Sequence, residues 1–571
     1  MACVIPPPST STVRKRTLRT SKGATTMSAD VIVVGGGTAG APLAARLSED
    51  PSRSVLLLEA GADVSKQAAF PSDLRDLRSM AGAMLGHPHN WSFVGNLTPQ
   101  LPYTVPRGRI LGGTSSINGV YFIRPRRIDM DGWAAAGNSA WSADKILPVL
   151  QRMETDEMFG DNASMHGADG PIPVYRETKS PSLYARTFCD ACAAVGFNEE
   201  PDLNDIDQLT GYGLMPRNSQ HGRRMNTALT YLNPVRDSRA NLKILGNTFV
   251  HRVLFKGNRA VGVVAEHQGR VTEFYAGEVI LSAGAIKTPH ILLLSGIGAS
   301  RDLHQHGIPT FVELPSVGKD FTDHVMSSLP WAPNQRMIEE DVNVRQLFEV
   351  ALNWTAHGSH TQSDLEIFPM LRSLSASLNG PIRSGMKHPF RALKSVRGVS
   401  LKRLYKHVAG GSNLSFSVIL NRPDSLGNIS LRNSNPYVQP KIDYNYLSAP
   451  RDLERMREAM RTGVKLLQTK PFAPYVKRLP LSEKMLENDD ALDQWMKNSL
   501  SLAIHLTGSA KMGSSDDPAS VVDQYGRVHG IHGLRVADLS ILPITPSRAP
   551  AVTATMIGER ISDFVTGREA Q

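Results

Sequence analysis

Cysteine and long hydrophobic runs are scarce in this sequence. Three cysteines in 571 residues cannot build a disulfide framework, and so low a count favours a reducing, cytoplasmic compartment. No run of about eighteen apolar residues occurs, so the sequence predicts no membrane-spanning helix. Hydrophobic residues make up 41% of the chain, as in ordinary globular proteins, and its length allows two or more cores.

Two of the three cysteines form a CxxC pair, Cys189 and Cys192. The pair lies in an apparent helix, Tyr184 to Val195, and no second pair exists to complete a zinc site. We therefore interpret both cysteines as structural and expect no metal centre.

Acidic residues are in the minority, which gives a formal net charge of +10 and a pI near 9.4. Residues 383–407 hold eight Lys or Arg, two His and no acid, with apolar residues such as Phe390 and Leu401 interleaved. Two interpretations remain open: a solvated face on an insert, or a patch for the inner membrane surface or an acidic partner. No nucleic-acid fold motif is present, so we expect no nucleic-acid partner.

Residues 1–29 show no hydrophobic periodicity. They contain five Lys or Arg, no acid and many Ser, Thr and Pro, without the apolar stretch of a secretory signal. A transit peptide, a flexible tail and an upstream start codon all fit this composition, and Met27 would be a sensible start. We expect residues 1–29 to be disordered.

Residues 30–61 follow the order strand, glycine turn, helix, strand. The apolar run from Asp30 to Val34 predicts a buried parallel strand, and Ala39 to Leu47 predicts a helix. Three glycines between them have GxGxxG spacing and allow a tight turn, an approach to a pyrophosphate and close helix–strand packing: Gly35, Gly37 and Gly40.

Glu59 ends the second strand, nineteen residues after Gly40, where a carboxylate can accept hydrogen bonds from a ribose diol. An ordinary βαβ unit with a glycine turn does not explain this acid. The sequence therefore predicts a dinucleotide site that also includes Thr38 and Ala39 at the helix start, whose N–H groups suit phosphate, and Ala60.

A second glycine motif runs from Arg107 to Phe122 and contains Gly112, Gly113 and Thr114. Here the sequence resembles the glucose–methanol–choline (GMC) oxidoreductases, and the resemblance continues through residues 279–298 and 505–513. It implies FAD as cofactor and an alcohol-type substrate. The residues that it adds to the cofactor site are Arg107, Gly112, Gly113, Thr114, Asn118, Gly119, Val120, Val250, Ala283, Asp538 and Leu539.

The resemblance places the active-site histidine at His505, as a base for the substrate hydroxyl. The family normally has a second His or Asn further on, where this chain has Pro550 or Ala551, depending on the direction of counting. The resemblance makes Pro550 a possible substrate contact and adds Ala551 to the cofactor site. Arg548 could contact the substrate if it turns inward, although a guanidinium cannot act as a base near neutral pH. A packed core histidine is the alternative for His505.

Two further departures refine the expected function. Ile117 stands near the position where some relatives attach FAD through a histidine, so FAD should be bound without a covalent link. The segment from Arg548 to Thr555, together with Gly508-Ser509, is similar to the GMC subgroup associated with the redox cofactor mycofactocin. That likeness implies a dehydrogenase that reoxidises reduced mycofactocin and passes electrons to the respiratory chain.

The predicted fold is α/β. It combines a doubly wound, Rossmann-like FAD-binding domain (30–180, 230–330 and 500–567) with an antiparallel-sheet substrate-binding domain (181–229 and 331–499). Three function classes remain: a flavin dehydrogenase of an alcohol-type group, which we favour; a GMC-fold lyase or decarboxylase; and an FAD-binding protein without activity.

Overall fold

The computed structural model of the chain describes residues 27–64, 69–77, 79–179, 181–341, 347–370, 414–479 and 481–568. The prediction of a disordered tail is wrong for residues 27–29, which begin the strand Met27–Val34 because they pair with residues 274–276. The rest of the predicted tail lies outside the described residues, and so does the whole basic stretch at 383–407. What we expect of these two segments stays a prediction.

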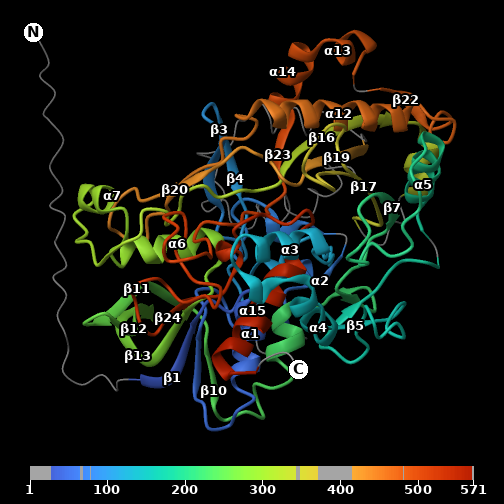
Figure 1. Cartoon of the computed structure of the whole chain (residues 1–571). Helices are drawn as coiled ribbons and strands as arrows, with labels where there is room; N and C mark the ends of the chain where they lie inside the picture. The colour runs from blue at the N-terminus through green and yellow to red at the C-terminus, as the bar shows by residue number, and fades with distance from the viewer. Residues whose placement is uncertain are drawn as a thin grey trace, which may run out of the picture.

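A mixed sheet forms the lower left part of Figure 1. Five of its strands run parallel: β10 (Leu242–Leu245), β2 (Val55–Leu58), β1 (Met27–Val34), β13 (Arg270–Leu281) and β24 (Leu534–Val536). The hairpin of β11 (Thr248–Lys256) and β12 (Arg259–His267) extends this sheet in antiparallel fashion from β13. The strands predicted at 30–34 and 54–58 are β1 and β2, and their buried β-branched and leucine side chains lie in the first core.

Helix α1 (Gly40–Leu47) crosses from β1 to β2, as the glycine pattern predicts. A Cβ atom on Gly40 would lie 1.9 Å from the carbonyl oxygen of Gly35, so only glycine permits this close packing. The C-terminal helix α15 (Ala551–Thr566) packs on α1, and a Cβ on its Gly558 would lie 2.1 Å from the Ala39 carbonyl oxygen. Figure 1 shows these two helices, the first and last of the fold, side by side.

Helix α6 (Gly284–Leu294) begins earlier than the sequence indicates. We expect a helix from Thr288, but the carboxylate of Asp538 accepts hydrogen bonds from the Gly284 N–H at 2.8 Å and from the Thr288 hydroxyl at 2.5 Å. This long-range cap holds the first turn of α6, and no local pattern predicts it.

A second sheet, antiparallel throughout, lies in the upper right of Figure 1. Its strand order is β22 (Val476–Arg478), β16 (Val325–Pro333), β19 (Leu414–Leu420), β18 (Leu365–Met370), β17 (Val350–Trp354) and β7 (Gly211–Leu214), and β23 (Leu500–Leu502) also pairs with β16. The amphipathic helix α12 (Pro450–Leu467) covers one face of this sheet, and α5 (Leu183–Val195) packs beside α12. A second hydrophobic core fills this region.

Further elements surround the two sheets. The helices are α2 (Ser72–Arg75), α3 (Arg127–Ala135), α4 (Ala143–Met153), α7 (Ser300–Gln305), α8 (Gln335–Asp341), α13 (Glu483–Glu487) and α14 (Asp489–Ser499). A four-stranded sheet of β20 (Asn428–Ser430), β21 (Lys441–Asp443), β3 (Phe93–Thr98) and β4 (Leu101–Val105) lies between the larger sheets in Figure 1.

The domain boundaries predicted near 330 and 500 cut across elements of the second sheet. Strand β16 starts at Val325, and β23 starts at Leu500, yet both belong to the antiparallel sheet. We propose that the substrate-binding domain starts near 325 in its second segment and ends near 502.

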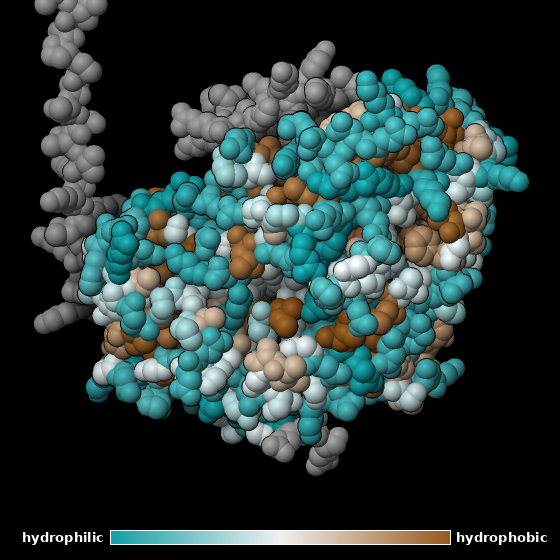
Figure 2. Space-filling view, turned by 45° about the horizontal axis from the view of Figure 1, so that its top comes forward, coloured by the Kyte–Doolittle hydropathy of each residue, from teal (hydrophilic) through white to brown (hydrophobic). Residues whose placement is uncertain are grey.

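Both cysteines of the CxxC pair belong to α5. Cys192 is buried, and burial raises the pKa of the Cys189 thiol to about 12, which makes it a poor nucleophile. No helix in the described ranges is long and apolar enough to cross a membrane. On the face shown in Figure 2, hydrophobic residues form separate small groups among hydrophilic ones.

Candidate active site

One long cavity runs between the mixed sheet and the antiparallel sheet. Its walls come from the loops after β1 and β2, the second glycine motif, the start of α6, the loop before Leu506 and the N-terminus of α15. Of the residues predicted from the sequence, those that line it are Gly35, Gly37, Thr38, Ala39, Glu59, Ala60, Arg107, Gly113, Thr114, Asn118, Gly119, Val250, Ala283, His505, Asp538, Leu539, Pro550 and Ala551.

Four predicted residues do not line the cavity. Gly40 supports the turn at Gly35, and Gly112, with φ +87°, donates its N–H to the Gly36 carbonyl oxygen at 2.7 Å. Val120 has a left-handed φ of 55° and is buried. Arg548 is 1% exposed and lies behind the wall.

The glycine turn and Glu59 form one end of the cavity. Gly35 has φ +100°, and a Cβ there would lie 2.4 Å from the carbonyl oxygen of Ser282. The Glu59 carboxylate accepts hydrogen bonds from the backbone N–H groups of Gly36 at 2.9 Å and Gly61 at 2.6 Å. Burial raises the pKa of Glu59 to about 7, although these two N–H groups pull it down.

The second glycine motif closes over the first. A Cβ on Gly113 would lie 2.6 Å from the Cα of Gly37, so the two loops meet with no room for side chains. The side chain of Asn118 accepts a hydrogen bond from Arg224 Nη1 at 2.7 Å, which fixes the loop that carries it. Ile117 is buried and lines the cavity beside Asn118.

His505 also lines the cavity and follows a strained residue. Ile504 has φ 72°, a rare conformation for a β-branched residue, and the next N–H, that of His505, donates to Asp323 Oδ1 at 2.8 Å. The ring of His505 is hydrogen-bonded through Nδ1 to Nδ1 of His324 at 2.9 Å. His324 Nε2 lies 2.9 Å from the carbonyl oxygen of Pro546.

These contacts define which nitrogens carry protons. A backbone carbonyl only accepts, so the proton of His324 lies on Nε2. Burial lowers the pKa of His324 to about 4, so this ring is neutral near pH 7 and its Nδ1 accepts. His505 must then donate through Nδ1, which leaves Nε2 without a proton.

The pKa of His505 also favours a base. Burial, followed by the neighbouring His324 and Arg107, holds it well below its ordinary value, so the ring is neutral near pH 7. A neutral imidazole that lines a cavity can accept a proton from a ligand there. Among the described residues the ring makes one hydrogen bond, from Nδ1 to His324, and it lines the cavity, which argues against a packed core histidine.

The positions expected to carry a second His or Asn are apolar. Pro550 and Ala551 line the cavity, and Pro550 is the N-cap residue of α15 with no side-chain cap. The N-terminus of α15, which is the positive end of the helix dipole, therefore lies at the cavity wall. Arg548 points elsewhere: its Nη2 lies 3.6 Å from Glu200 Oε1, so the structure does not support the predicted substrate contact through Arg548.

Three residues in or beside the cavity were not predicted from the sequence. One is His324, which directly precedes β16. Tyr121 and Glu366 both line the cavity, and the Tyr121 hydroxyl donates to Glu366 Oε1 at 2.9 Å. The available signal was an acid within the short apolar strand β18. A buried acid is rare unless it has a partner, so its presence there indicates a specific contact.

The family follows from comparison with known proteins. The GMC oxidoreductase family profile matches residues 29–326 in its N-terminal part and 423–558 in its C-terminal part. The chain is a GMC oxidoreductase.

Relatives of this GMC oxidoreductase cover nearly its whole length. An uncharacterised GMC-type oxidoreductase of Rhodococcus erythropolis is 36% identical over 543 residues, which is 95% of this chain and 99% of the relative. An oxygen-dependent choline dehydrogenase of Rhizobium meliloti (strain 1021) is 32% identical over 563 residues, 95% and 96% of the two chains. The crystal structure of pyridoxine 4-oxidase from Mesorbium loti is similar with a TM-score of 0.80, 26% identity and coverage of 94% and 98%.

The chain is thus an FAD-dependent oxidoreductase that acts on CH–OH groups, as the fold and family predicted from the sequence imply. The cavity fits FAD on three counts. Gly37 lines the cavity, and a Cβ there would meet only the Gly113 Cα at 3.8 Å, so the backbone is open to a ligand. The N-terminus of α1 has no side-chain cap, so its N–H groups are open to phosphate. Glu59 presents a buried carboxylate to the same cavity.

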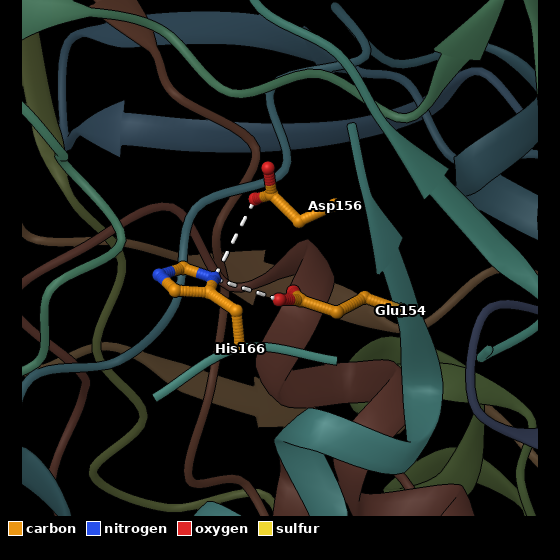
Figure 3. A group of neighbouring side chains, drawn as sticks. All are labelled: Glu154, Asp156 and His166. Carbon is orange, nitrogen blue, oxygen red and sulfur yellow. Dashed lines mark hydrogen bonds and ion pairs between the residues drawn. The ribbon is translucent and has the colours of Figure 1, made fainter. Parts of the chain in front are cut away.

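A separate cluster resembles a metal site but is already neutralised. Figure 3 shows Glu154 and Asp156, on β5 (Glu154–Asp156), both directed at the ring of His166. Three more side chains, all charged, bond to this group: Arg124, Arg176 and Asp202. Burial opposes a charge on His166, but its hydrogen bonds to Asp202 and Glu154 outweigh burial and raise its pKa. Three cations then balance three carboxylates, so we interpret the cluster as a network of buried ion pairs that holds the surrounding segments together.

Proposed function

We propose that His505 removes the hydroxyl proton of an alcohol-type substrate in this GMC oxidoreductase. The observation that carries the proposal is the chain of contacts from His505 Nδ1 to His324 Nδ1 and from His324 Nε2 to the Pro546 carbonyl, because it leaves His505 Nε2 free to accept a proton. The substrate O–H bond breaks, its proton moves to Nε2, and the ring becomes an imidazolium that still donates to His324. Bound FAD supplies the acceptor for the hydride that leaves the alcohol carbon.

The remaining residues position the reactants. Glu59 and the N-terminus of α1 would hold the ribose and the pyrophosphate of the cofactor, and Gly37 and Gly113 would let the backbone approach it. The Asp323 carboxylate holds the backbone of His505, and the strained Ile504 turns that backbone so that the ring lines the cavity. Leucine and methionine side chains along the antiparallel sheet exclude water from the reacting group.

Anaerobic mixing of the FAD-loaded protein with aliphatic, aromatic and amino alcohols tests this proposal. We expect at least one class to bleach the oxidised flavin absorbance and to yield the aldehyde. Turnover without bleaching would favour the lyase or decarboxylase alternative. Binding without bleaching by any alcohol would favour an FAD-binding protein without activity.

We further propose that FAD is held without a covalent link and that electrons leave to a respiratory acceptor, with reduced mycofactocin as a candidate substrate. The support is the likeness of residues 548–555 to the mycofactocin-associated subgroup and the isoleucine at 117. Oxygen is the competing acceptor, since the relative from Rhizobium meliloti is named oxygen-dependent. Reoxidation of the reduced protein by a quinone, faster than by air, would support this proposal, and rapid peroxide formation would overturn it.

The basic stretch at 383–407, outside the described residues, supports a peripheral membrane contact of this dehydrogenase. Each Lys or Arg near an anionic surface contributes on the order of 1 kcal/mol, weakened by salt. Co-sedimentation with anionic and neutral vesicles, with Lys402, Arg403 and Lys406 each changed to Glu in one variant, tests it. Equal binding to both vesicle types would leave this stretch as a solvated face.

A further inference from the structure

Lys287 is a buried cation in the wall of the cavity. It belongs to α6, in which every residue except Gly284 is buried, and it is itself 7% exposed. Burial, followed by the charge of Arg109, lowers the pKa of Lys287 to about 7. A lysine is almost never buried to this extent without a partner, because it is costly to take an ammonium group out of water. The ammonium group of Lys287 therefore requires compensation.

Two aromatic rings and a histidine contact this ammonium group. Nζ lies over the rings of Phe249 and Trp91, 4.9 Å and 5.7 Å from their centroids. Nζ also lies 2.8 Å from His290 Nδ1, which accepts a hydrogen bond because burial lowers the pKa of His290 to about 2 and keeps its ring neutral. An ammonium group has three N–H donors, and in the described part of the chain His290 takes one of them. Two donors are left for a ligand in the cavity.

The carboxylates of this region have other partners. Glu59 accepts hydrogen bonds from two backbone N–H groups, and Glu266 accepts one from the hydroxyl of Tyr437. The charge that acts on Lys287 is that of Arg109, a second cation, and among the described residues no carboxylate forms an ion pair with Lys287. This part of the wall therefore suits a ligand group that accepts hydrogen bonds.

The place of Lys287 in the cavity indicates which part of FAD it faces. The Thr248 N–H donates to the backbone carbonyl oxygen of Glu59 at 2.8 Å, so β11 starts beside the residue that we assign to the ribose. Phe249 and Val250 follow on β11 and line the cavity, and α6 packs on this strand. The ribose joins the pyrophosphate, which we assign to the N-terminus of α1, to the adenine. The adenine therefore extends towards Phe249 and Lys287.

We propose that Lys287 binds the adenine of FAD by donating a hydrogen bond to one of its ring nitrogens, with Phe249 and Trp91 as apolar walls for the base. Adenine offers acceptor nitrogens at its edge and flat faces that stack on aromatic rings. The contact adds to the cofactor site a lysine that neither glycine motif predicts. It rests on the cofactor positions proposed above and not on the role of His505, because it concerns the affinity for FAD.

The test measures how tightly the full chain holds FAD and ADP. Serial dilution and ultrafiltration of the FAD-loaded protein give the dissociation constant of FAD from the flavin in the filtrate. ADP carries the adenosine and the pyrophosphate of FAD without the flavin, so its competition with FAD gives a second constant. We expect Lys287→Met to raise both constants about 10-fold or more, because it removes a charge-assisted hydrogen bond. Lys287→Gln, a second neutral variant that keeps an N–H donor for His290, should also raise both.

Lys256→Met is the matched control, because it removes one positive charge from the exposed end of β11 and should leave both constants unchanged. The unfolding temperature of the flavin-free chain should not fall in Lys287→Met, since the change removes a buried cation that no carboxylate compensates.

Three results would overturn the inference: unchanged constants in both Lys287 variants, ADP that does not compete with FAD in the unmodified protein, or weaker binding accompanied by a lower unfolding temperature of the flavin-free chain. Glu59→Gln separates this contact from the proposed ribose site. Weaker FAD binding in Glu59→Gln with unchanged binding in Lys287→Met would keep the ribose site and remove only the contact of Lys287.

Discussion

His505 and His324 come from segments 181 residues apart and share one hydrogen bond, Nδ1 to Nδ1 at 2.9 Å. Since the Pro546 carbonyl oxygen fixes the proton of His324 on Nε2, this single contact sets the tautomer of His505. The tautomer of His505, the proposed base, therefore depends on His324, a residue that is fully buried.

Replacing His324 should weaken the proposed base, His505, without removing it. In His324→Ala, His505 loses the acceptor that fixes its tautomer, and the rate constant of flavin reduction should fall by about 10-fold or more. Loss of the neighbouring ring should also move the apparent pKa of His505 up towards its ordinary value. Rapid-mixing traces over a pH series measure both effects, and a variant with reduced rate but unchanged pKa would indicate mere loss of packing.

The pH dependence of the unmodified protein follows from the same contact. The pKa of His505 is held well below 6.5 by burial, then by His324 and Arg107, so the base is neutral at pH 7 and loses activity only when it is protonated. With a neutral alcohol, the rate of flavin reduction should stay level as the pH falls through 6.5 and should decline only at more acid pH. A midpoint at or above 6.5 would contradict the assigned surroundings of His505.

FAD should leave the denatured protein. Ile117 lines the cavity where some GMC relatives carry a histidine joined to flavin, and an aliphatic side chain cannot form that bond. Acid precipitation should therefore release the yellow colour into the supernatant. Colour that remains with the pellet would show a covalent link through another residue.

Arg548 should matter for stability more than for catalysis. Its guanidinium is buried against Glu200 and does not line the cavity, so Arg548→Met should change flavin reduction by no more than about 3-fold. The free energy of unfolding should fall by about 1–3 kcal/mol, because Glu200 loses one of two cations but retains Arg126. Urea unfolding of the FAD-loaded protein measures the second effect, and a large kinetic loss with unchanged stability would place Arg548 at the substrate.

The first βαβ unit could be predicted from the sequence because its determinants are local. Val31 to Val34, the three glycines and Glu59 lie within one short segment, and each has a distinct steric or electrostatic reason. The start of α6 could not be predicted in this way, because Asp538, a residue from the far end of the chain, caps it. Long-range caps leave no periodic pattern.

The residues around His505 were harder to predict from the sequence, because their contacts are long-range as well. His324 gains its role only when β16 brings it beside His505, and Glu366 gains its hydrogen bond only when β18 places it opposite Tyr121. In the sequence the first resembles an ordinary loop histidine and the second an acid in a short strand. The pairing of β7 with β17 joins segments more than a hundred residues apart, which hydrophobic alternation does not reveal.

Flavin reduction in His505→Ala shows directly whether His505 is the base. The variant, loaded with FAD and mixed anaerobically with an alcohol that bleaches the unmodified protein, should reduce its flavin about 100-fold or more slowly, while FAD binding stays the same. Unchanged reduction in a variant that still holds FAD would contradict the account.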